Sequence, residues 1–306
     1  MTLTELRYIV AVARERHFGR AAEACFVSQP TLSVAIKKLE EELDVKIFER
    51  GANEVTMTPL GEDIVRQAQS VIEQASAIKD IAKRGKDPLD GPLRLGIIYT
   101  IGPYLLPELV RHCIDLYPRM PLMLQENFTQ KLLDMLRTGE LDCAIMAEPF
   151  PDAGLAVAPL YDESFVVAVP AVHPLAKKER ISAEELKAET MLLLGNGHCF
   201  RDHVLEVCPE FARFSTDAEG IRKSFEGSSL ETIKHMVASG MGVTVVPALS
   251  VPEHVPPHLR YVPFEDPAPT RRVVLAWRRT FTRYEAVAAL RNAVYACKLS
   301  GVKLLS

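Results

Sequence analysis

The chain has 306 residues, a length that predicts about two domains. Its 36 basic and 40 acidic side chains give a formal net charge of −4, so nucleic-acid binding would have to come from a local basic patch. With 48% hydrophobic and 25% charged residues, the composition excludes collagen-like, coiled-coil and disordered chains. No apolar run approaches the roughly 18 residues of a membrane span. The first residues lack a signal-peptide layout, so we expect a cytoplasmic protein with no membrane partner.

Six cysteines are spread along the chain, with no CxxC pair and no Cys/His spacing typical of zinc sites. Six in this length is also too few for a disulfide scaffold. We therefore expect no metal, no cofactor and, in a reducing cytoplasm, six thiols that are mostly buried. They are Cys25, Cys113, Cys143, Cys199, Cys208 and Cys297.

The N-terminal part of the sequence predicts three helices followed by a small β-hairpin, or wing. Thr2 and Glu5 have the spacing of a capping box at the start of the first helix. A short second helix is expected over residues 19–25, and Ser28 is a good N-cap for a third. Residues 46–58 hold β-rich pieces around a turn. Two small helices joined by a tight turn are typical of DNA-binding modules, because the second helix can lie in the major groove.

The third helix carries candidate DNA contacts opposite its apolar stripe, and the wing adds a basic residue. Glutamine can pair with base edges, serine and threonine with bases or phosphates, and lysine and arginine with phosphates. On charge alone an ordinary solvated face is the better interpretation, because the first 50 residues carry equal numbers of basic and acidic side chains. The turn, the N-cap and the wing favour DNA instead. The candidates are Gln29, Pro30, Thr31, Ser33, Lys37, Lys38 and Arg50.

A long helix is expected after Pro59, and its apolar residues repeat at intervals close to a heptad seam. Such a stripe needs a partner. The helix either packs on its own chain or pairs with a second copy, and the narrow seam favours pairing. The stripe consists of Leu60, Ile64, Ala68, Val71, Ala75, Ile78 and Ala82.

From Leu93 onward, apolar runs alternate with amphipathic segments, which predicts an α/β fold with a mostly parallel sheet. The region is long enough for two α/β lobes. Expected strands cover 93–99, 120–128, 141–146, 165–169, 191–194, 243–246 and 273–277. Expected helices cover 103–117, 130–138, 230–239 and 284–298.

Residues 3–60 resemble the winged helix-turn-helix of the LysR-type transcriptional regulators. The matching motifs run through the whole module in order. They are Phe18-Gly19-Arg20-Ala21-Ala22-Glu23, Ser28-Gln29-Pro30-Thr31-Leu32-Ser33, Ile36, Leu39-Glu40, Leu43, Phe48-Glu49-Arg50 and Thr58-Pro59-Leu60-Gly61.

This resemblance implies an organisation for the full chain. It would place a DNA-binding domain at 1–60, a linker or dimerisation helix at 61–87, and a regulatory domain at 88–306. The regulatory domain would consist of two Rossmann-like lobes similar to periplasmic binding proteins. One lobe would take 88–162 and 268–306, and the other 163–267. Family members are usually dimers or tetramers on double-stranded DNA, so we expect a homodimer or homotetramer with RNA polymerase as a further partner.

The run Gly195-Asn196-Gly197-His198-Cys199-Phe200-Arg201-Asp202 resembles the peroxide-sensing branch of this family. In that branch a Gly-His-Cys-x-Arg-Asp run carries the reactive cysteine. The resemblance implies hydrogen peroxide as the signal, antioxidant genes as targets, and Cys199 with Cys208 as the redox-active pair. The other four cysteines are expected to be inert. Further matching segments are 100–107, 141–143, 229–232 and 246–249.

Cys199 has features of a reactive thiol. Peroxide oxidises thiolates, and both helix N-terminal amides and nearby positive charge lower a thiol pKa. We therefore expect a lowered pKa, opposed somewhat by Asp202. Oxidation gives a sulfenic acid, which a second thiol converts to a disulfide. Thr100 and Thr129, taken alone, are better explained as helix caps, but the resemblance implies a peroxide pocket that can protonate the leaving oxygen. Its residues are Thr100, Thr129, His198, Arg201 and Asp202.

The spacing of the two cysteines predicts a switch. Nine residues of α-helix rise about 13 Å, whereas a disulfide needs Cα atoms within about 7 Å. Joining Cys199 to Cys208 would therefore unravel the helix between them, in which Phe200, Val204 and Cys208 share one side. We expect refolding of residues 199–225 to alter contacts between subunits and reposition the DNA modules.

Three other functions compete with this interpretation. A LysR-type regulator that responds to a small organic co-inducer would share the fold, but it would not need Cys199. A thiol peroxidase would share the first chemical step, but the DNA module and a resolving step that requires refolding argue against an enzyme. A solute-binding protein would explain the lobes but not residues 1–60.

Overall fold

The structure is a computed structural model of the chain. It divides into two compact units, one built mainly from residues 1–88 and the other from most of residues 89–306. Within the described residues, no helix is long and apolar enough to cross a membrane. The description covers the whole chain except residues 51–54, 84–86, 152–153, 210–225, 228 and 306.

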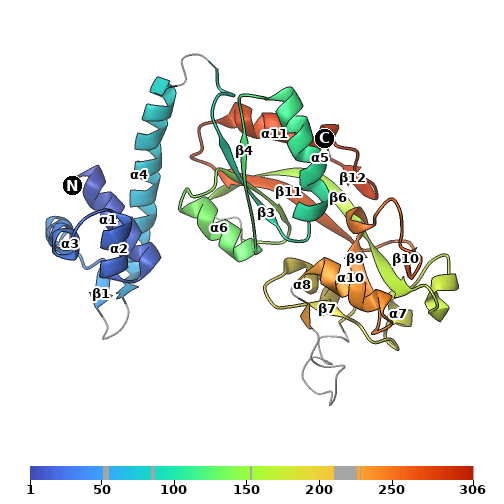
Figure 1. The fold of residues 1–306 in the computed structure, drawn as a ribbon. Coiled ribbons are helices and arrows are strands. Elements are labelled where there is room, and N and C mark those ends of the chain that lie inside the picture. Colours follow the sequence, from blue (N-terminus) through green and yellow to red (C-terminus); the bar gives the residue numbers. More distant parts are fainter. Residues whose placement is uncertain (51–54, 84–86, 152–153, 210–225, 228, 306) are drawn as a thin grey trace. The chain divides into compact units, whose positions relative to one another are not determined.

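The N-terminal unit is a helix-turn-helix followed by a two-stranded antiparallel wing (Figure 1). The expected capping box is confirmed, because the Glu5 amide donates to Thr2 Oγ1 at 3.3 Å and the Thr2 amide donates to Glu5 Oε2 at 2.7 Å. Ser28 caps the third helix by accepting from the Thr31 amide. The elements are α1 (Leu3–Glu15), α2 (Phe18–Ala24), α3 (Gln29–Leu43), β1 (Phe48–Arg50), β2 (Val55–Met57) and α4 (Pro59–Lys83).

A carboxylate on α3 fixes the start of the wing. Glu40 is buried, and its Oε1 accepts from the amides of Ile47 at 2.8 Å and Phe48 at 3.2 Å. Lys46 donates to the other oxygen at 3.2 Å. Because a buried carboxylate is costly unless it is hydrogen-bonded, these contacts hold wing and helix in one arrangement.

Helix α4 packs part of its apolar stripe on its own unit. Ala68 is buried in the core that α1, α2 and α3 share, and Ile64 is partly buried against it. Farther along, Val71 is 37% and Ile78 is 69% exposed, while the side chain of Ala82 lies outside the described part of the chain. The alternative of packing on the same chain is therefore confirmed for Ile64 and Ala68, whereas Leu60 is 52% exposed, and pairing of the exposed positions with a second copy stays a prediction.

The second unit contains an eight-stranded mixed sheet with the order β10-β6-β11-β5-β3-β4 along its main path. Strands β3, β4 and β5 are parallel, which confirms the expected βαβαβ arrangement. Strand β11 is antiparallel to both β5 and β6. The elements of this part are β3 (Leu93–Ile98), α5 (Gly102–Leu116), β4 (Leu122–Asn127), α6 (Thr129–Arg137), β5 (Cys143–Ala147), β11 (Thr270–Arg278), α11 (Tyr284–Ala296) and β12 (Val302–Leu304).

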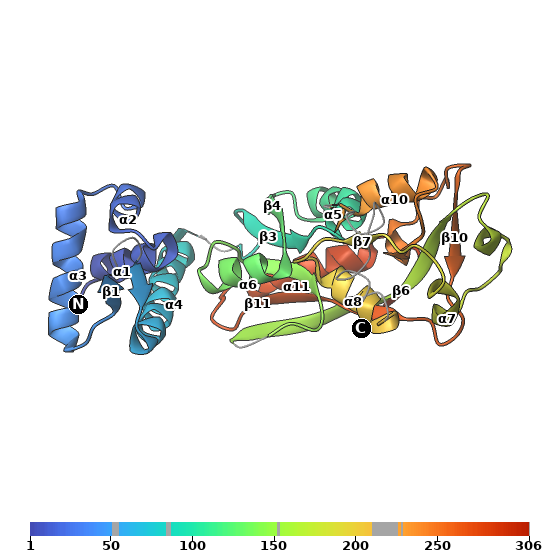
Figure 2. The same ribbon diagram turned by 90° about the horizontal axis from the view of Figure 1, so that it is seen from below.

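One long strand, β6 (Leu155–Pro170), connects two parts of this sheet (Figures 1 and 2). Its first part pairs with β11 and β12, and its last part pairs with β9 (Thr244–Pro247) and β10 (Leu259–Pro263). The strand expected over 165–169 is therefore too short. Polar residues and Pro159 interrupt the apolar run before it, so the sequence pattern does not show a strand there.

The remaining elements surround a second core that Phe165, Phe200, Val204, Ile233 and their neighbours form. A two-stranded parallel pair leads from this core to helix α8. These elements are η1 (Pro174–Lys177), α7 (Ala183–Leu186), β7 (Leu193–Leu194), α8 (Cys199–Val207), β8 (Glu226–Gly227), α10 (Leu230–Ala238) and η3 (Ala248–Ser250).

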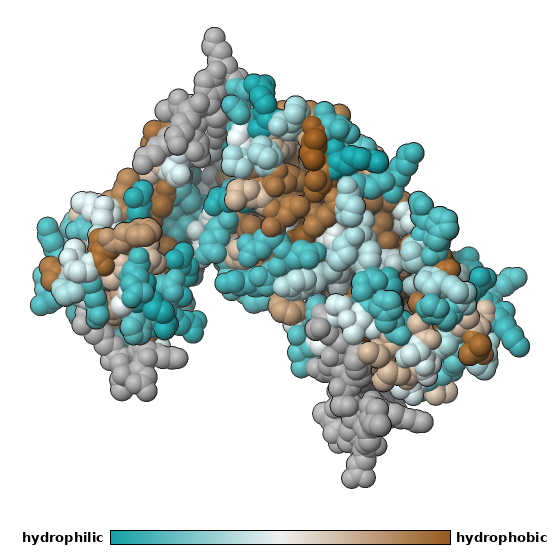
Figure 3. All heavy atoms as spheres, in the orientation of Figure 1, coloured by the Kyte–Doolittle hydropathy of each residue, from teal (hydrophilic) through white to brown (hydrophobic). Residues whose placement is uncertain are grey.

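The second unit also has exposed apolar side chains on α5 and on β4, which is a sheet edge. Ile114 is 63% exposed and Leu116 52%, while on β4 Met123 is 56% and Leu124 41% exposed. Figure 3 shows apolar surface where α5 and β4 lie. An apolar area beside an unpaired strand edge is suited to contact with another protein chain.

Candidate redox site and candidate DNA-binding face

Helix α8 begins at Cys199, as the sequence predicts. His198 is its N-cap residue, and Gly197 before it has a φ of +96°, a conformation that side chains rarely adopt. A Cβ added at Gly197 would lie 3.3 Å from the Phe128 ring. Glycine therefore lets the chain turn tightly against Phe128 and start a helix with the cysteine in its first turn.

Three rings stand beside the cysteine. The His198 ring is 4.8 Å from the Phe128 ring and 5.9 Å from the Tyr99 ring, and Tyr99 and Phe128 are 5.2 Å apart, all edge-to-face. His198 itself is 6% exposed. Since Tyr99 follows β3 and Phe128 follows β4, the ring cluster joins α8 to the carboxyl ends of two parallel strands.

Burial raises the pKa of the Cys199 thiol above its usual value of 9.0, so the expected lowered pKa is wrong for the reduced structure. Three smaller effects oppose burial: the Thr129 hydroxyl, the positive charge of Arg271 and the backbone amide at the helix start. The charge of Asp202 adds to the raised pKa, as expected. Burial prevails because a thiolate loses its water when it is enclosed. Part of Cys199 still reaches solvent.

The Thr129 hydroxyl is the polar group that acts directly on the thiol. Its contact lowers the pKa of Cys199, and its Oγ1 is buried with no other hydrogen-bond partner among the described residues. Thr129 is also the first residue of α6. A buried hydroxyl with unused hydrogen-bonding capacity next to a thiol can bind a small polar molecule.

The positive charge near Cys199 comes from Arg271 on β11. Its side chain is fully buried and pairs with the fully buried Glu163 at 2.7 Å. Its Nη1 donates to Thr100 Oγ1 at 2.8 Å and its Nη2 donates to the Thr100 carbonyl at 3.0 Å. The guanidinium also lies over the Phe200 ring at 5.0 Å. Arg271 therefore connects Thr100, at the end of β3, with the first turn of α8.

The structure places three residues of the expected pocket at the thiol or linked to it, whereas the side chains of the other two are directed elsewhere. Thr129 and His198 lie beside Cys199, and Thr100 is joined to it through Arg271. Arg201 instead donates to the Leu194 carbonyl at 2.8 Å. We therefore assign the positive charge near the thiol to Arg271. Asp202 is exposed.

Sequence reasoning missed Arg271 and Glu163. No local motif surrounds either residue, and the two are 108 positions apart. The one available signal is that each residue lies two positions before an expected strand, 165–169 or 273–277, where an acidic and a basic side chain would have to pair if they were buried.

Cys208 ends α8 on the inner side of the helix. It is fully buried in the second core together with Phe200 and Val204, which confirms the inward orientation expected for the reduced form. Both cysteines are reduced. Cys199 is the first residue of this nine-residue helix and Cys208 directly follows its last, so the two cysteines lie at opposite ends of a helix about 13 Å long. The rest of the expected switch, residues 210–225, lies outside the described residues.

His203, one turn after Cys199, is a second buried titratable group. Its Nε2 lies 2.8 Å from the Glu148 carbonyl, and because a carbonyl only accepts, Nε2 carries the proton. Its Nδ1 is buried without a hydrogen-bond partner among the described residues. Burial lowers the pKa of His203 below its usual value of 6.5, so the ring is neutral.

Burial also raises the pKa of the four remaining cysteines, whose inertness toward peroxide stays a prediction. Burial raises the pKa of Cys113 to about 11 and that of Cys297 to about 12, and it also raises the pKa of Cys143 and Cys25. Cys25 is half-buried and the other three are buried. None of the four begins a helix in the way that Cys199 does.

The face of α3 that carries the DNA candidates is open. Gln29, Pro30, Thr31, Lys37 and Lys38 are exposed, and Ser33 is half-buried. Lys37 lies 3.6 Å from Glu41 across one helical turn, a weak surface pair that phosphates could replace. The side chain of Arg50 lies outside the described part of the chain. Figure 2 shows α3 along one side of the N-terminal unit.

Comparison with known proteins assigns the family. Residues 3–62 match the family described as bacterial regulatory helix-turn-helix protein, lysR family. Residues 86–296 match the family described as LysR substrate binding domain. The chain therefore belongs to the LysR family of bacterial transcriptional regulators.

Its relatives identify the branch. The chain is 40% identical, over 91% of its length and 90% of the relative, to a hydrogen peroxide-inducible genes activator of Pectobacterium carotovorum subsp. carotovorum. It is 39% identical, over 94% of both chains, to the DNA-binding transcriptional dual regulator OxyR of Escherichia coli K12. Within the LysR family, the chain belongs to the OxyR branch.

Solved structures agree with this assignment. A full-length cysteine-to-aspartate mutant of OxyR from Pseudomonas aeruginosa is 52% identical, with a TM-score of 0.77 over 97% of this chain and 99% of the other. A cysteine-to-serine mutant of Corynebacterium glutamicum OxyR with hydrogen peroxide bound is 34% identical, with a TM-score of 0.64 over 96% of this chain and 91% of the other.

Proposed function

We propose that this protein is a DNA-binding transcriptional regulator of antioxidant genes that senses hydrogen peroxide through Cys199. The observation that carries the proposal is a partly accessible thiol at the start of a helix, with the buried Thr129 hydroxyl in contact with it and the buried Arg271 guanidinium near enough to lower its pKa. The names of its relatives, which include hydrogen peroxide-inducible genes activators, support it.

The first chemical step is oxidation of the thiol. Sulfur attacks one peroxide oxygen and the O–O bond breaks, so Cys199 becomes a sulfenic acid. The thiol proton joins the departing hydroxide as water. The sulfur is oxidised by two electrons and the peroxide is reduced. Because burial keeps Cys199 protonated near neutral pH, the proton must leave as the O–O bond breaks.

Two threonines are placed to help in this step. The Thr129 hydroxyl, beside the sulfur, would hydrogen-bond the peroxide and pass a proton toward the leaving oxygen. Thr100 Oγ1 already accepts from Arg271, so its own hydrogen can be donated to a second peroxide oxygen. We keep His198, Arg201 and Asp202 as proposed residues of the site; Arg201 would act by holding the Leu194 carbonyl of β7 and so positioning the start of α8.

The second step makes a disulfide. The Cys208 thiol attacks the sulfenic sulfur, the S–O bond breaks, and water leaves. Because α8 separates the two sulfur atoms, this step needs α8 to unwind and Cys208 to leave its core. Unwinding exposes apolar side chains of the second core, which costs free energy, and the disulfide compensates for this cost. α8 would therefore be stable as a helix when both thiols are reduced and unwound when the disulfide has formed. We propose that this exchange alters contacts between subunits and thereby repositions the DNA modules.

We further propose that the protein acts on double-stranded DNA as a homodimer or homotetramer and contacts RNA polymerase. The exposed part of the α4 stripe and the apolar area on α5 and β4 support self-association. We keep the domain limits 1–60, 61–87 and 88–306, with lobes of 88–162 plus 268–306 and of 163–267. The site of action would be the cytoplasm, where bacterial DNA lies.

The test compares two single variants. Cys199→Ser is expected to abolish the peroxide-induced change in the DNA footprint of the full-length protein, and Cys113→Ser, which removes another buried thiol, is expected to preserve it. If the protein were instead a regulator of the organic co-inducer type, the Cys199→Ser variant would still be inducible. Binding of the small metabolite that acts as co-inducer would then raise the melting temperature of the protein. Repeated consumption of peroxide, far faster than any footprint change, would indicate a peroxidase instead.

A further inference from the structure

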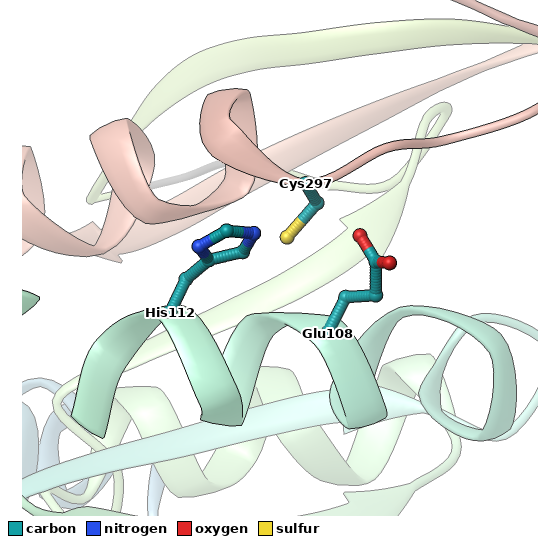
Figure 4. A group of neighbouring side chains, drawn as sticks. All are labelled: Glu108, His112 and Cys297. Carbon is teal, nitrogen blue, oxygen red and sulfur yellow. The ribbon is translucent and has the colours of Figure 1, made fainter. Parts of the chain in front are cut away.

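A third group of side chains, distant in sequence from the redox pair, converges between two helices of the second unit. Glu108 and His112 stand one turn apart on α5, and Cys297 follows the end of α11. Their ligand atoms all lie within 4.8 Å of one another. Figure 4 shows the thiol directed between the imidazole and the carboxylate.

We propose that Glu108, His112 and Cys297 bind a divalent zinc ion. A carboxylate oxygen, an imidazole nitrogen and a thiolate sulfur are all donors that Zn²⁺ accepts, and three protein ligands leave a fourth position for water. Thiolate with imidazole favours zinc over magnesium or calcium. The expectation of no metal rested on sequence spacing, which cannot show a ligand set drawn from two helices far apart in the chain.

The present geometry requires only a small adjustment. Zinc–ligand bonds of about 2.0 to 2.3 Å in a tetrahedron put ligand atoms about 3.3 to 3.7 Å apart, so the three groups must close in by about 1 Å. Glu108 and His112 are half-buried, and rotation of their side chains can supply this movement. The backbone amide of Lys298 donates to Glu108 Oε2 at 2.7 Å, which holds the carboxylate toward the end of α11.

Charge balance also favours the ion. Zinc displaces the thiol proton, so the Cys297 Sγ–H ceases to donate to the Ala293 carbonyl, from which it now lies 3.2 Å away, and a zinc–sulfur bond replaces it. One carboxylate and one thiolate then neutralise the two positive charges. A neutral complex is suited to a half-buried site, and the one cation paired with Glu108 among the described residues, Arg111 at 3.9 Å, is mostly exposed to solvent. The ion would tie the C-terminal helix to α5 and stabilise that part of the sheet domain.

Cobalt supplies a direct spectroscopic test on the full chain. After chelator treatment, CoCl₂ is expected to give a sulfur-to-cobalt charge-transfer band and the visible bands of tetrahedral cobalt, and ZnCl₂ to remove both. Cys297→Ser is expected to lose the charge-transfer band. His112→Gln, at a half-buried position, is expected to weaken zinc binding at least about tenfold.

Matched controls distinguish this site from the redox pair. Cys113→Ser, next to His112, and Cys199→Ser are both expected to keep the cobalt spectrum. Zinc is expected to raise the melting temperature of the wild type but not of His112→Gln. A wild-type protein without a charge-transfer band, or a Cys297→Ser variant that keeps it, would overturn the proposal. If Cys297→Ser does not fold, the test rests on His112→Gln, and an unchanged zinc affinity in that variant would also overturn the proposal.

Discussion

The buried pair of Arg271 and Glu163 allows a prediction in which two destabilising changes have opposite effects on the reactive thiol. Arg271→Met removes the positive charge that lowers the pKa of Cys199, so that pKa should rise further. Glu163→Gln leaves the guanidinium in place without its carboxylate. The positive charge is then no longer paired with the Glu163 carboxylate, so its effect on the thiol should strengthen and the pKa of Cys199 should fall.

The effect on stability should be similar in the two variants. Both side chains are fully buried, and Arg271 makes further hydrogen bonds to the Thr100 hydroxyl and carbonyl, while Glu163 accepts from the Leu249 amide at 3.0 Å. Removing one partner of a buried pair leaves an uncompensated charge, which costs about 3 to 5 kcal/mol. We therefore expect both variants to lower the free energy of unfolding of the second unit by this amount.

The assay is the rate at which iodoacetamide alkylates Cys199, measured from pH 6.5 to 10 by mass spectrometry of the peptide that contains it. At pH 7.5 alkylation should be slower than wild type in Arg271→Met and faster in Glu163→Gln, because the thiolate is the nucleophile. Denaturant unfolding measured in parallel separates reactivity from stability. Rates that change in the same direction in both variants would show that loosening of the fold, and not charge, controls the thiol.

Three further predictions follow from single residues. Gly197→Ala should destabilise the second unit by about 1 to 3 kcal/mol, because alanine must adopt a φ of +96° against Phe128; unchanged denaturant unfolding would contradict this. The pKa of His203 is lower in the folded state than in the unfolded state, where it is about 6.5. As the pH falls below that value, the unfolded state binds a proton that the folded state does not, so the free energy of unfolding should decrease; above it, His203 has no such effect. His203→Gln should flatten this decline, and an unaltered slope would exclude His203 as its source. Lys37→Ala should weaken binding to operator and random DNA alike, whereas Gln29→Ala should weaken operator binding alone; equal losses on both DNAs for Gln29→Ala would remove it from base recognition.

Local rules predicted the N-terminal unit and the start of α8 well. A capping box, a Ser28 N-cap and regular apolar spacing depend on neighbouring residues, and these elements formed as expected. Cys199 follows a glycine that turns the chain into the helix, and that signal is also local. The buried side of α8 likewise followed from the spacing of Phe200 and Cys208.

The long-range features could not be predicted in the same way. Strand β6 begins ten residues before the expected strand, because pairing with β11 and β12 stabilises its first part. That part contains polar residues, so the apolar pattern of the sequence does not indicate a strand there. The pKa of Cys199 rose instead of falling because burial depends on segments that pack from elsewhere in the chain. Arg271 was missed for the same reason, since its partners Glu163, on β6, and Thr100, in the turn after β3, come from distant parts of the sequence.

The central claim is that oxidation of Cys199 unwinds α8 and joins it to Cys208. The most direct measurement combines a brief peroxide pulse with hydrogen exchange and mass spectrometry of the full-length protein. We predict a linked Cys199–Cys208 peptide, with the other four cysteines still reduced, and a loss of amide protection across residues 200–208 that dithiothreitol reverses. Protection of α8 that persists after the protein has responded to peroxide, or a response with both thiols still reduced, would contradict the account.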